Sequence, residues 1–284
     1  MARITQQSSI HTTGTSYENE PIIKSDGVGE VMQWLASTGG SNVTIDQAAT
    51  TNAMSISVPS MTVGSLDIGH GLSGDTNSTA VGTGALDSNA THITDGALYN
   101  TAIGSLALTA LNHDDADYNT AVGGRAGDGI VSGARNTAIG TWSLSATAAN
   151  GDDNVAVGYY ALLNFTGSDA TAVGSGALDA SVSDVAVTAV GQNALGVCNG
   201  GDYNTAVGKS ALLTVDGNNN TAVGYASLNA DCVSDNTAVG KEALKLFTGS
   251  NATAVGSGAA DAATSATNLT AVGKDALGAC SEGL

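Results

Sequence analysis

Residues 204–212 read Asn-Thr-Ala-Val-Gly-Lys-Ser-Ala-Leu, and this stretch decides the fold because the chain carries twelve versions of it. The motif glycines follow one another at intervals of 22, 19, 17, 18, 16, 17, 17, 16, 16, 16 and 17 residues. Self-similarity at a short period is typical of a solenoid, in which each repeat packs only on its neighbours. A period of 16 or 17 residues accommodates two short strands and two turns but no pair of helices, so we predict an all-β parallel solenoid, or β-roll.

The Thr-Ala-Val segment of each motif is the predicted strand, because β-branched residues favour extended backbone. Alternation then places Thr and Val on one face, with Ala and Gly on the other. Neither face is polar, so we expect both to be covered, one by a second strand carrying the Ala-Leu pair and one by another chain. The predicted structural core of the repeat consists of Val81, Ile103, Val122, Ile139, Val157, Val173, Val190, Val207, Val223, Val239, Val255 and Val272.

The invariant glycine of the motif is expected to permit a turn, or a close backbone approach that a Cβ atom would block. The repeat glycines are Gly82, Gly104, Gly123, Gly140, Gly158, Gly174, Gly191, Gly208, Gly224, Gly240, Gly256 and Gly273. Asn precedes the strand in seven units, from Asn100 to Asn236. This pattern predicts a ladder of asparagines along the stack.

The chain also contains a longer repeat, which is made of several short ones. Residues 153–202 match residues 235–284 at 31 of 50 positions without a gap, so five coils were duplicated as a block. Cys198 and Cys280 are copies of each other in this duplication. Cys198 and Cys232 are two coils apart, which is too far for a disulfide, so we expect no bond between them.

The chain is expected to have three parts. Residues 1–27 are polar and irregular and predict an extended docking arm; residues 28–65 predict a small β-rich anchor, with strands over 28–35 and 54–58. Residues 66–284 predict the rod, beginning with a degenerate first coil at 66–72 and continuing with twelve regular coils.

The composition excludes several functions. With 8 Lys plus Arg against 26 Asp plus Glu, the net charge is -18, which disfavours nucleic acid and anionic membranes as partners. Aromatic residues make up only 4 % of the chain, so the core is expected to be thin. No apolar run is long enough to span a membrane, and the start has no secretory h-region.

No catalytic, cofactor-binding or metal-binding residue is predicted. The four histidines share no metal-ligand spacing, and the acidic turns at 114–117 and 152–153 match no calcium loop, so we interpret them as turn caps. Gly208-Lys209-Ser210 lacks the earlier glycine of a phosphate-binding loop. A polysaccharide depolymerase would need paired carboxylates, yet Glu242 is replaced by Tyr160 in the duplicated block. We therefore do not expect an enzyme.

The units Asn-Thr-Ala-Val-Gly-x-x-Ala-Leu resemble the head repeats of trimeric autotransporter adhesins and, more closely, arrays in bacteriophage tail-fibre proteins. The resemblance covers roughly residues 66–284 and implies a homotrimeric, left-handed parallel β-roll. Residues 25–34 also resemble virion-proximal segments of fibres from marine and cyanobacterial phages, which implies docking to other virion proteins through the N-terminal region. The repeat spacing by itself does not distinguish three chains from two.

Autotransporters need a secretory signal and a C-terminal membrane barrel, and neither is evident here. We therefore expect a structural phage tail fibre, assembled in the host cytoplasm, that projects from the virion and supports adsorption to the host surface. At the C-terminal end we expect either further sequence after Leu284 or a separate distal capping or receptor-binding protein, because an open solenoid end invites further strand pairing. The alternatives are a capsid decoration fibre, a bacterial surface adhesin and, less favoured, a depolymerase.

Overall fold

A computed structural model of the 284-residue chain describes residues 21–25, 30–34, 60–63, 66–69, 77–87, 97–146, 149–181, 185–198 and 201–278. The chain divides into two compact units, Met1–Ser57 and Val58–Leu284. The described residues contain strands and turns but no helix, so none of them forms a helix that could cross a membrane.

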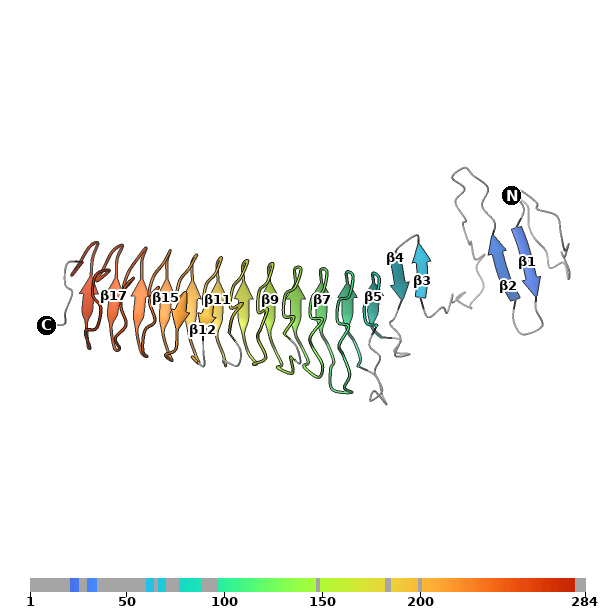
Figure 1. The fold of residues 1–284 in the computed structure, drawn as a ribbon, viewed down its shortest axis with the longest axis horizontal. Coiled ribbons are helices and arrows are strands. Elements are labelled where there is room, and N and C mark those ends of the chain that lie inside the picture. The colour runs from blue at the N-terminus through green and yellow to red at the C-terminus, as the bar shows by residue number, and fades with distance from the viewer. Residues whose placement is uncertain are drawn as a thin grey trace, which may run out of the picture. The chain divides into compact units, whose positions relative to one another are not determined.

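The second unit is a parallel β-solenoid, as predicted, in which one short strand from each coil lies beside the next (Figure 1). Neighbouring strands pair in strict register, Thr opposite Thr and Ala opposite Ala, except where Val155 takes the Thr position. The strands are β5 (Thr79–Val81), β6 (Thr101–Ile103), β7 (Thr120–Val122), β8 (Thr137–Ile139), β9 (Val155–Val157), β10 (Thr171–Val173), β11 (Thr188–Val190), β13 (Thr205–Val207), β15 (Thr221–Val223), β16 (Thr237–Val239), β17 (Thr253–Val255) and β18 (Thr270–Val272).

The core of each coil is built from small side chains. The central Ala of every one of these strands is buried, from 6 % exposed at Ala80 to 0 % at Ala206. Across the coil, the Ala-Leu pair of the motif closes the interior, and leucines such as Leu212 and Leu244 are fully buried. A methyl group facing a leucine fills the narrow interior, which explains why so few aromatic residues are needed.

The Ala-Leu pair does not form the predicted second strand. The residues two and four positions after each motif glycine have φ between +46° and +69°, as at Tyr160 and Leu162, so this side of the coil is a series of left-handed turns. Backbone hydrogen bonds still join these turns from one coil to the next. For example, the backbone N–H of Leu162 donates to the carbonyl of Ala177 at 3.0 Å. Only β12 (Val197–Cys198) and β14 (Thr214–Val215) add a second short sheet among the described residues.

Two antiparallel hairpins precede the solenoid in the sequence. In the first unit β1 (Pro21–Ser25) pairs with β2 (Glu30–Trp34), so a strand lies within 28–35 as predicted, and its partner comes from the predicted arm. In the second unit β3 (Ser60–Val63) pairs with β4 (Leu66–Gly69). The predicted strand at 54–58 lies outside the described residues.

The prediction of a degenerate first coil at 66–72 is wrong. β4 runs antiparallel to β5, with Ile68 opposite Val81 and Gly69 opposite Ala80, whereas every solenoid coil returns its strand in the parallel direction. A segment that resembles the motif in composition can therefore pair with the first coil as an antiparallel strand, because antiparallel pairing does not need a full coil between the two strands.

Candidate functional site

The repeat glycines form a column in which each backbone passes very close to the next. Their φ values lie between +122° and +140°, a region that residues with a Cβ rarely adopt. A Cβ added at Gly123 would lie 2.7 Å from both the carbonyl carbon and the carbonyl oxygen of Gly140. The expected close backbone approach is thus confirmed, and it explains why glycine occupies this position in all twelve motifs.

The predicted core valines lie on the outer face of the sheet. None of the twelve is buried within the chain: Val223 is 36 % exposed, Ile103 41 % and Val272 71 %. The central Ala takes the inward position instead, because the side chains of a strand alternate and the space opposite the buried leucines admits only a methyl group. The valines and isoleucines therefore form a continuous apolar column beside the threonines, which we call the valine face.

The asparagines before the strands hold adjacent coils together through the backbone. At Asn220, which is 0 % exposed, Oδ1 accepts the N–H of Asn236 at 3.0 Å while Nδ2 donates to the carbonyl of Val233 at 2.9 Å. The predicted ladder exists, but its rungs join amide side chains to backbone and not to one another. The same hydrogen bond, in which the side-chain Oδ1 accepts a backbone N–H of the next coil, is made by Asn100, Asn119, Asn136, Asn154, Asn204 and Asn236.

A second polar ladder runs through the acidic turns, three residues before the strand. There a side-chain oxygen accepts a backbone N–H from the preceding coil, as Asp152 does from Ala134 at 2.8 Å and Asp202 from Val185 at 2.9 Å. Serine can take the same role, since Ser168 Oγ accepts the N–H of Asp152 at 3.0 Å. These bonds support the interpretation of the acidic turns as caps, and the described residues contain no group of three potential metal ligands.

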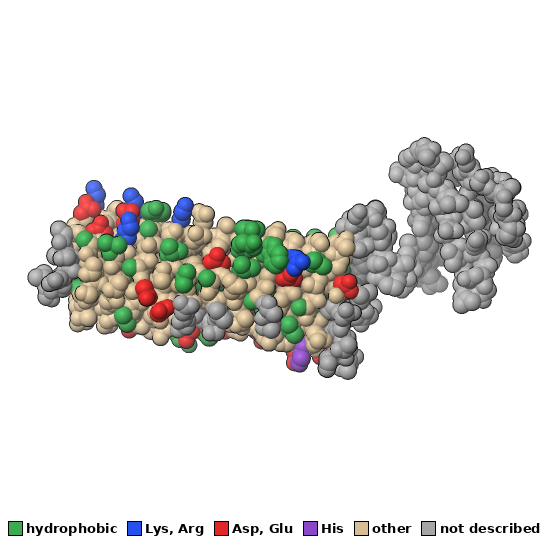
Figure 2. Space-filling model, viewed as in Figure 1, with side chains coloured by type: hydrophobic (Ala, Val, Ile, Leu, Met, Phe, Trp, Pro, Cys, Tyr) green, Lys and Arg blue, Asp and Glu red, His purple; other side chains and the backbone are tan. Residues whose placement is uncertain are grey.

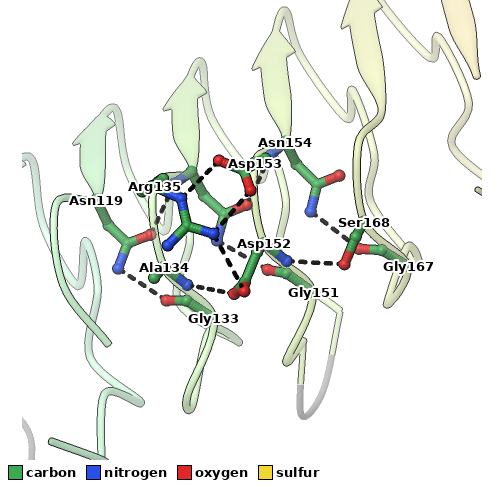
Figure 3. Close-up of polar contacts among 11 residues, drawn as sticks. Asn119, Gly133, Ala134, Arg135, Gly151, Asp152, Asp153, Asn154, Gly167 and Ser168 are labelled. Atoms are coloured by element: carbon green, nitrogen blue, oxygen red, sulfur yellow. Dashed lines mark hydrogen bonds and ion pairs between the residues drawn. The ribbon is translucent and has the colours of Figure 1, made fainter. Parts of the chain in front are cut away.

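Among the described residues, a groove opens beside the turns between β6 and β9. It has a volume of about 520 Å³ and is lined by residues that include Tyr118, Arg135 and Asp152. Arg135 donates through Nε and Nη2 to both carboxylate oxygens of Asp153, each at 2.7 Å, and through Nη2 to Asp152 at 3.3 Å (Figure 3). The hydrogen bond from Arg135 lowers the pKa of the Asp153 carboxyl.

Large aromatic side chains lie on the surface at turn positions. Tyr99 and Tyr118, on adjacent coils, are 50 % and 57 % exposed, and their rings stack with centroids 5.1 Å apart and planes 3° apart. On the opposite edge, after the strands, the guanidinium of Arg125 lies 4.7 Å over the ring of Trp142. Patches of hydrophobic side chains are visible on the surface of the rod in Figure 2.

Charges are unevenly distributed around the coil. Lys209, Lys241 and Lys274 directly follow a motif glycine, so the cations gather on the edge after the strand, and Figure 2 shows Lys and Arg along the upper part of the rod. Glu242 lies on this edge and contacts Lys245 at 3.2 Å, which lowers the pKa of its carboxyl. A carboxylate held ionised between lysines is a poor general acid, so nothing here supports a glycosidase at Glu242.

The cysteines follow the predicted register. Cys198 and Cys232 are buried, and each pairs with Val215, on opposite sides of it, so they lie two coils apart. Desolvation raises the pKa of the Cys232 thiol to about 12. The predicted separation of these two cysteines by two coils is confirmed, while Cys280 lies outside the described residues.

Comparison with known proteins gives no match to any family model, curated protein or solved structure. The residues of the groove were not predicted as a site, because they come from three coils whose turns differ in length. One signal was present in the sequence: Tyr occupies the position two residues before the strand in only three coils, where most others have Asp or Asn.

Proposed function

We propose that this chain is a non-enzymatic structural subunit of a homotrimeric fibre, and that the fibre projects from a virus particle as a tail fibre. The valine face carries this proposal. It repeats in all twelve coils, and in the single chain none of its β-branched apolar side chains is buried, with eight of the twelve at least 36 % exposed.

A contiguous apolar surface of this length is unusual on a monomer and is typical of an interface. The face is straight because the strands pair in register, so a second and third copy can pack along the full length of the rod. The choice of three copies rests on the resemblance of the repeats to trimeric β-rolls.

The virion assignment rests on the resemblance to phage tail-fibre arrays and on the architecture of the rod. Successive coils add length without adding any feature that suits catalysis. A rod of this kind can separate an attachment point from a distal binding surface. We propose that residues 1–65 attach the fibre to other virion proteins and that the rod supports adsorption to the host surface.

The assembly is tested by measuring mass in solution. Wild-type protein should have three times the mass of the 27.7 kDa chain by light scattering. Val223→Asp would place a carboxylate in each of three packed columns and should abolish the trimer. Tyr225→Asp, an exposed change in the same coil but off the valine face, should leave it intact. A wild-type monomer, or a trimeric Val223→Asp variant, would contradict the proposal.

The location is tested separately with gold-labelled antibodies raised against residues 201–278. They should decorate fibres on purified virus particles from the source organism's lysate. Labelling of a bacterial cell surface with none on particles would favour the adhesin alternative.

A further inference from the structure

Two exposed tyrosines occupy backbone conformations that tyrosine does not favour. Tyr99 and Tyr118 each lie two residues before a strand, with φ of +59°. The same left-handed position is occupied by Asp153, Asp169 and Asn251 in other coils. Asn and Asp tolerate this region well, while an aromatic residue gains nothing there from local backbone preference.

These tyrosines also contribute little to the core. Their side chains are at least half exposed, and the interior beneath them is filled by other residues, including Ala116 and Leu111, which are fully buried. Strained, exposed aromatic side chains that the fold does not require indicate a role in recognition.

Tyr118 stacks on Tyr99 of the preceding coil and lies in the lining of the groove. The two rings are nearly parallel, with centroids 5.1 Å apart, and the Tyr118 side chain is 57 % exposed. The following coils contribute Arg135 and Asp152 to the same lining. Tyr118 thus brings an exposed aromatic ring to a groove that is built from successive coils.

The rest of the groove is polar and held in place by the fold. Asp117 Oδ1 accepts the N–H of Leu98 at 2.6 Å, and Asp152 is fixed by the N–H of Ala134 at 2.8 Å and by Arg135. Asp115 and Asn150 add exposed acceptor and donor groups to the lining. The volume of about 520 Å³ is large enough for a small ligand, and the mainly polar lining suits a ligand rich in hydroxyl groups.

We propose that this groove binds a neutral oligosaccharide of pyranose sugars, with one sugar ring stacked on Tyr118. The carbon-bound hydrogens of a pyranose face pack against an aromatic ring, and tyrosine provides such a surface with little loss of conformational freedom. The carboxylates and amide of the groove accept and donate hydrogen bonds to the sugar hydroxyls.

The charge of the groove selects a neutral ligand over an anionic one. Three carboxylates, those of Asp115, Asp117 and Asp152, line it together with Arg135 and His113. The guanidinium of Arg135 is shared between Asp152 and Asp153, and His113 lies 3.3 Å from Asp115. The lysines that follow the motif glycines lie on the other edge of the coil. Sulfated or uronic sugars would therefore meet a lining with more carboxylates than cations, which repels them.

This proposal deepens the attachment role of the fibre by naming a ligand class and a site. The test titrates full-length protein with the hexasaccharides of β-1,4-glucose, α-1,4-glucose and β-1,4-mannose, and with hexagalacturonate as the anionic probe. Saturation-transfer NMR reports contact with the sugar-ring protons, and the titration gives Kd. At least one neutral probe should bind, and hexagalacturonate should not.

The decisive variant is Tyr118→Asn, because Asn suits the left-handed backbone and the variant should fold. It should weaken binding of the neutral probe by about tenfold or more, the usual effect of removing a central aromatic contact. Tyr203→Asn is the matched control: it makes the same exchange at the same coil position, outside the groove, and should bind as the wild type does.

The inference is overturned if none of the three neutral probes binds, if hexagalacturonate binds more tightly than they do, or if Tyr118→Asn binds like the wild type. These outcomes leave the assembly proposal standing, since that depends on the trimer mass alone. Conversely, a monomeric wild type whose sugar binding requires Tyr118 would refute the trimer and support the groove.

Discussion

Exchanging Gly123 and its neighbour Gly124 for alanine, one at a time, should have very different effects. At Gly123 φ is +139°, and the new Cβ would lie 2.7 Å from the backbone carbonyl of Gly140 in the next coil. At Gly124 no heavy atom lies within 4 Å of the new Cβ, and φ is outside the left-handed region. The two changes are chemically identical and one residue apart, so each controls for the other.

The expected magnitude follows from two costs. Holding a residue with a Cβ in a region reserved for glycine costs about 1–3 kcal/mol, and an overpacked contact adds about 1–3 kcal/mol because the neighbouring backbone must move. Gly123→Ala should therefore lower the free energy of unfolding by about 3 kcal/mol or more per chain. For a unit of this size that corresponds to a fall in Tm of roughly 6–12 °C.

Thermal unfolding followed by far-UV circular dichroism, at equal protein concentration, measures the difference. Gly124→Ala should melt at or slightly above the wild-type temperature, because alanine restricts the unfolded chain. If the two variants melt within about 1 °C of each other, smaller than any shift these costs allow, the close approach of the glycine column does not exist in solution.

Three further predictions follow from the described contacts. Asn220→Ala should destabilise the fold by about 1–3 kcal/mol in urea unfolding, because it leaves the buried N–H of Asn236 without its acceptor; Asn150→Ala, at an exposed asparagine outside the ladder and outside the left-handed region, should cost much less. The Cys232 thiol should react slowly with Ellman's reagent at pH 8 and rapidly in denaturant. Since burial raises its pKa from 9.0 to about 12, its contribution to stability should be complete below pH 9 and lost as the pH rises toward 12, and Cys232→Ala should flatten that alkaline loss. Tyr203→Asn should raise stability by about 1 kcal/mol in urea unfolding, because Tyr203 has φ of +59° and its side chain is exposed; an unchanged or lower stability would show that the ring makes contacts that compensate for its backbone.

The sequence by itself determined the period, the strand and the parallel register. The Thr-Ala-Val-Gly motif recurs at nearly constant spacing, and only a stack of coils can place every copy beside the next. The spacing also predicted that Cys198 and Cys232 lie two coils apart, and the invariant glycine predicted a close backbone contact. These features depend on local pattern and on counting, so they could be predicted from the sequence without coordinates.

Which face of the strand points inward was decided only by the tertiary structure. Ala206 and Val207 are both apolar, so hydrophobicity cannot rank them. In the folded coil the methyl group of Ala206 is buried together with Leu212, whereas Val207 is 37 % exposed. The same is true of the left-handed turns, since no residue-type preference predicts φ above zero at Leu162.

The direction of β4 and the groove also required the structure. Antiparallel pairing of β4 with β5 depends on a turn and not on the motif that β4 resembles. Tyr118, Arg135 and Asp152 are separated by about one coil each in the sequence, and their meeting depends on turns of unequal length. A repeat pattern specifies what successive coils share, whereas a binding surface is made from the residues in which they differ, and only the stacked coils bring those residues together.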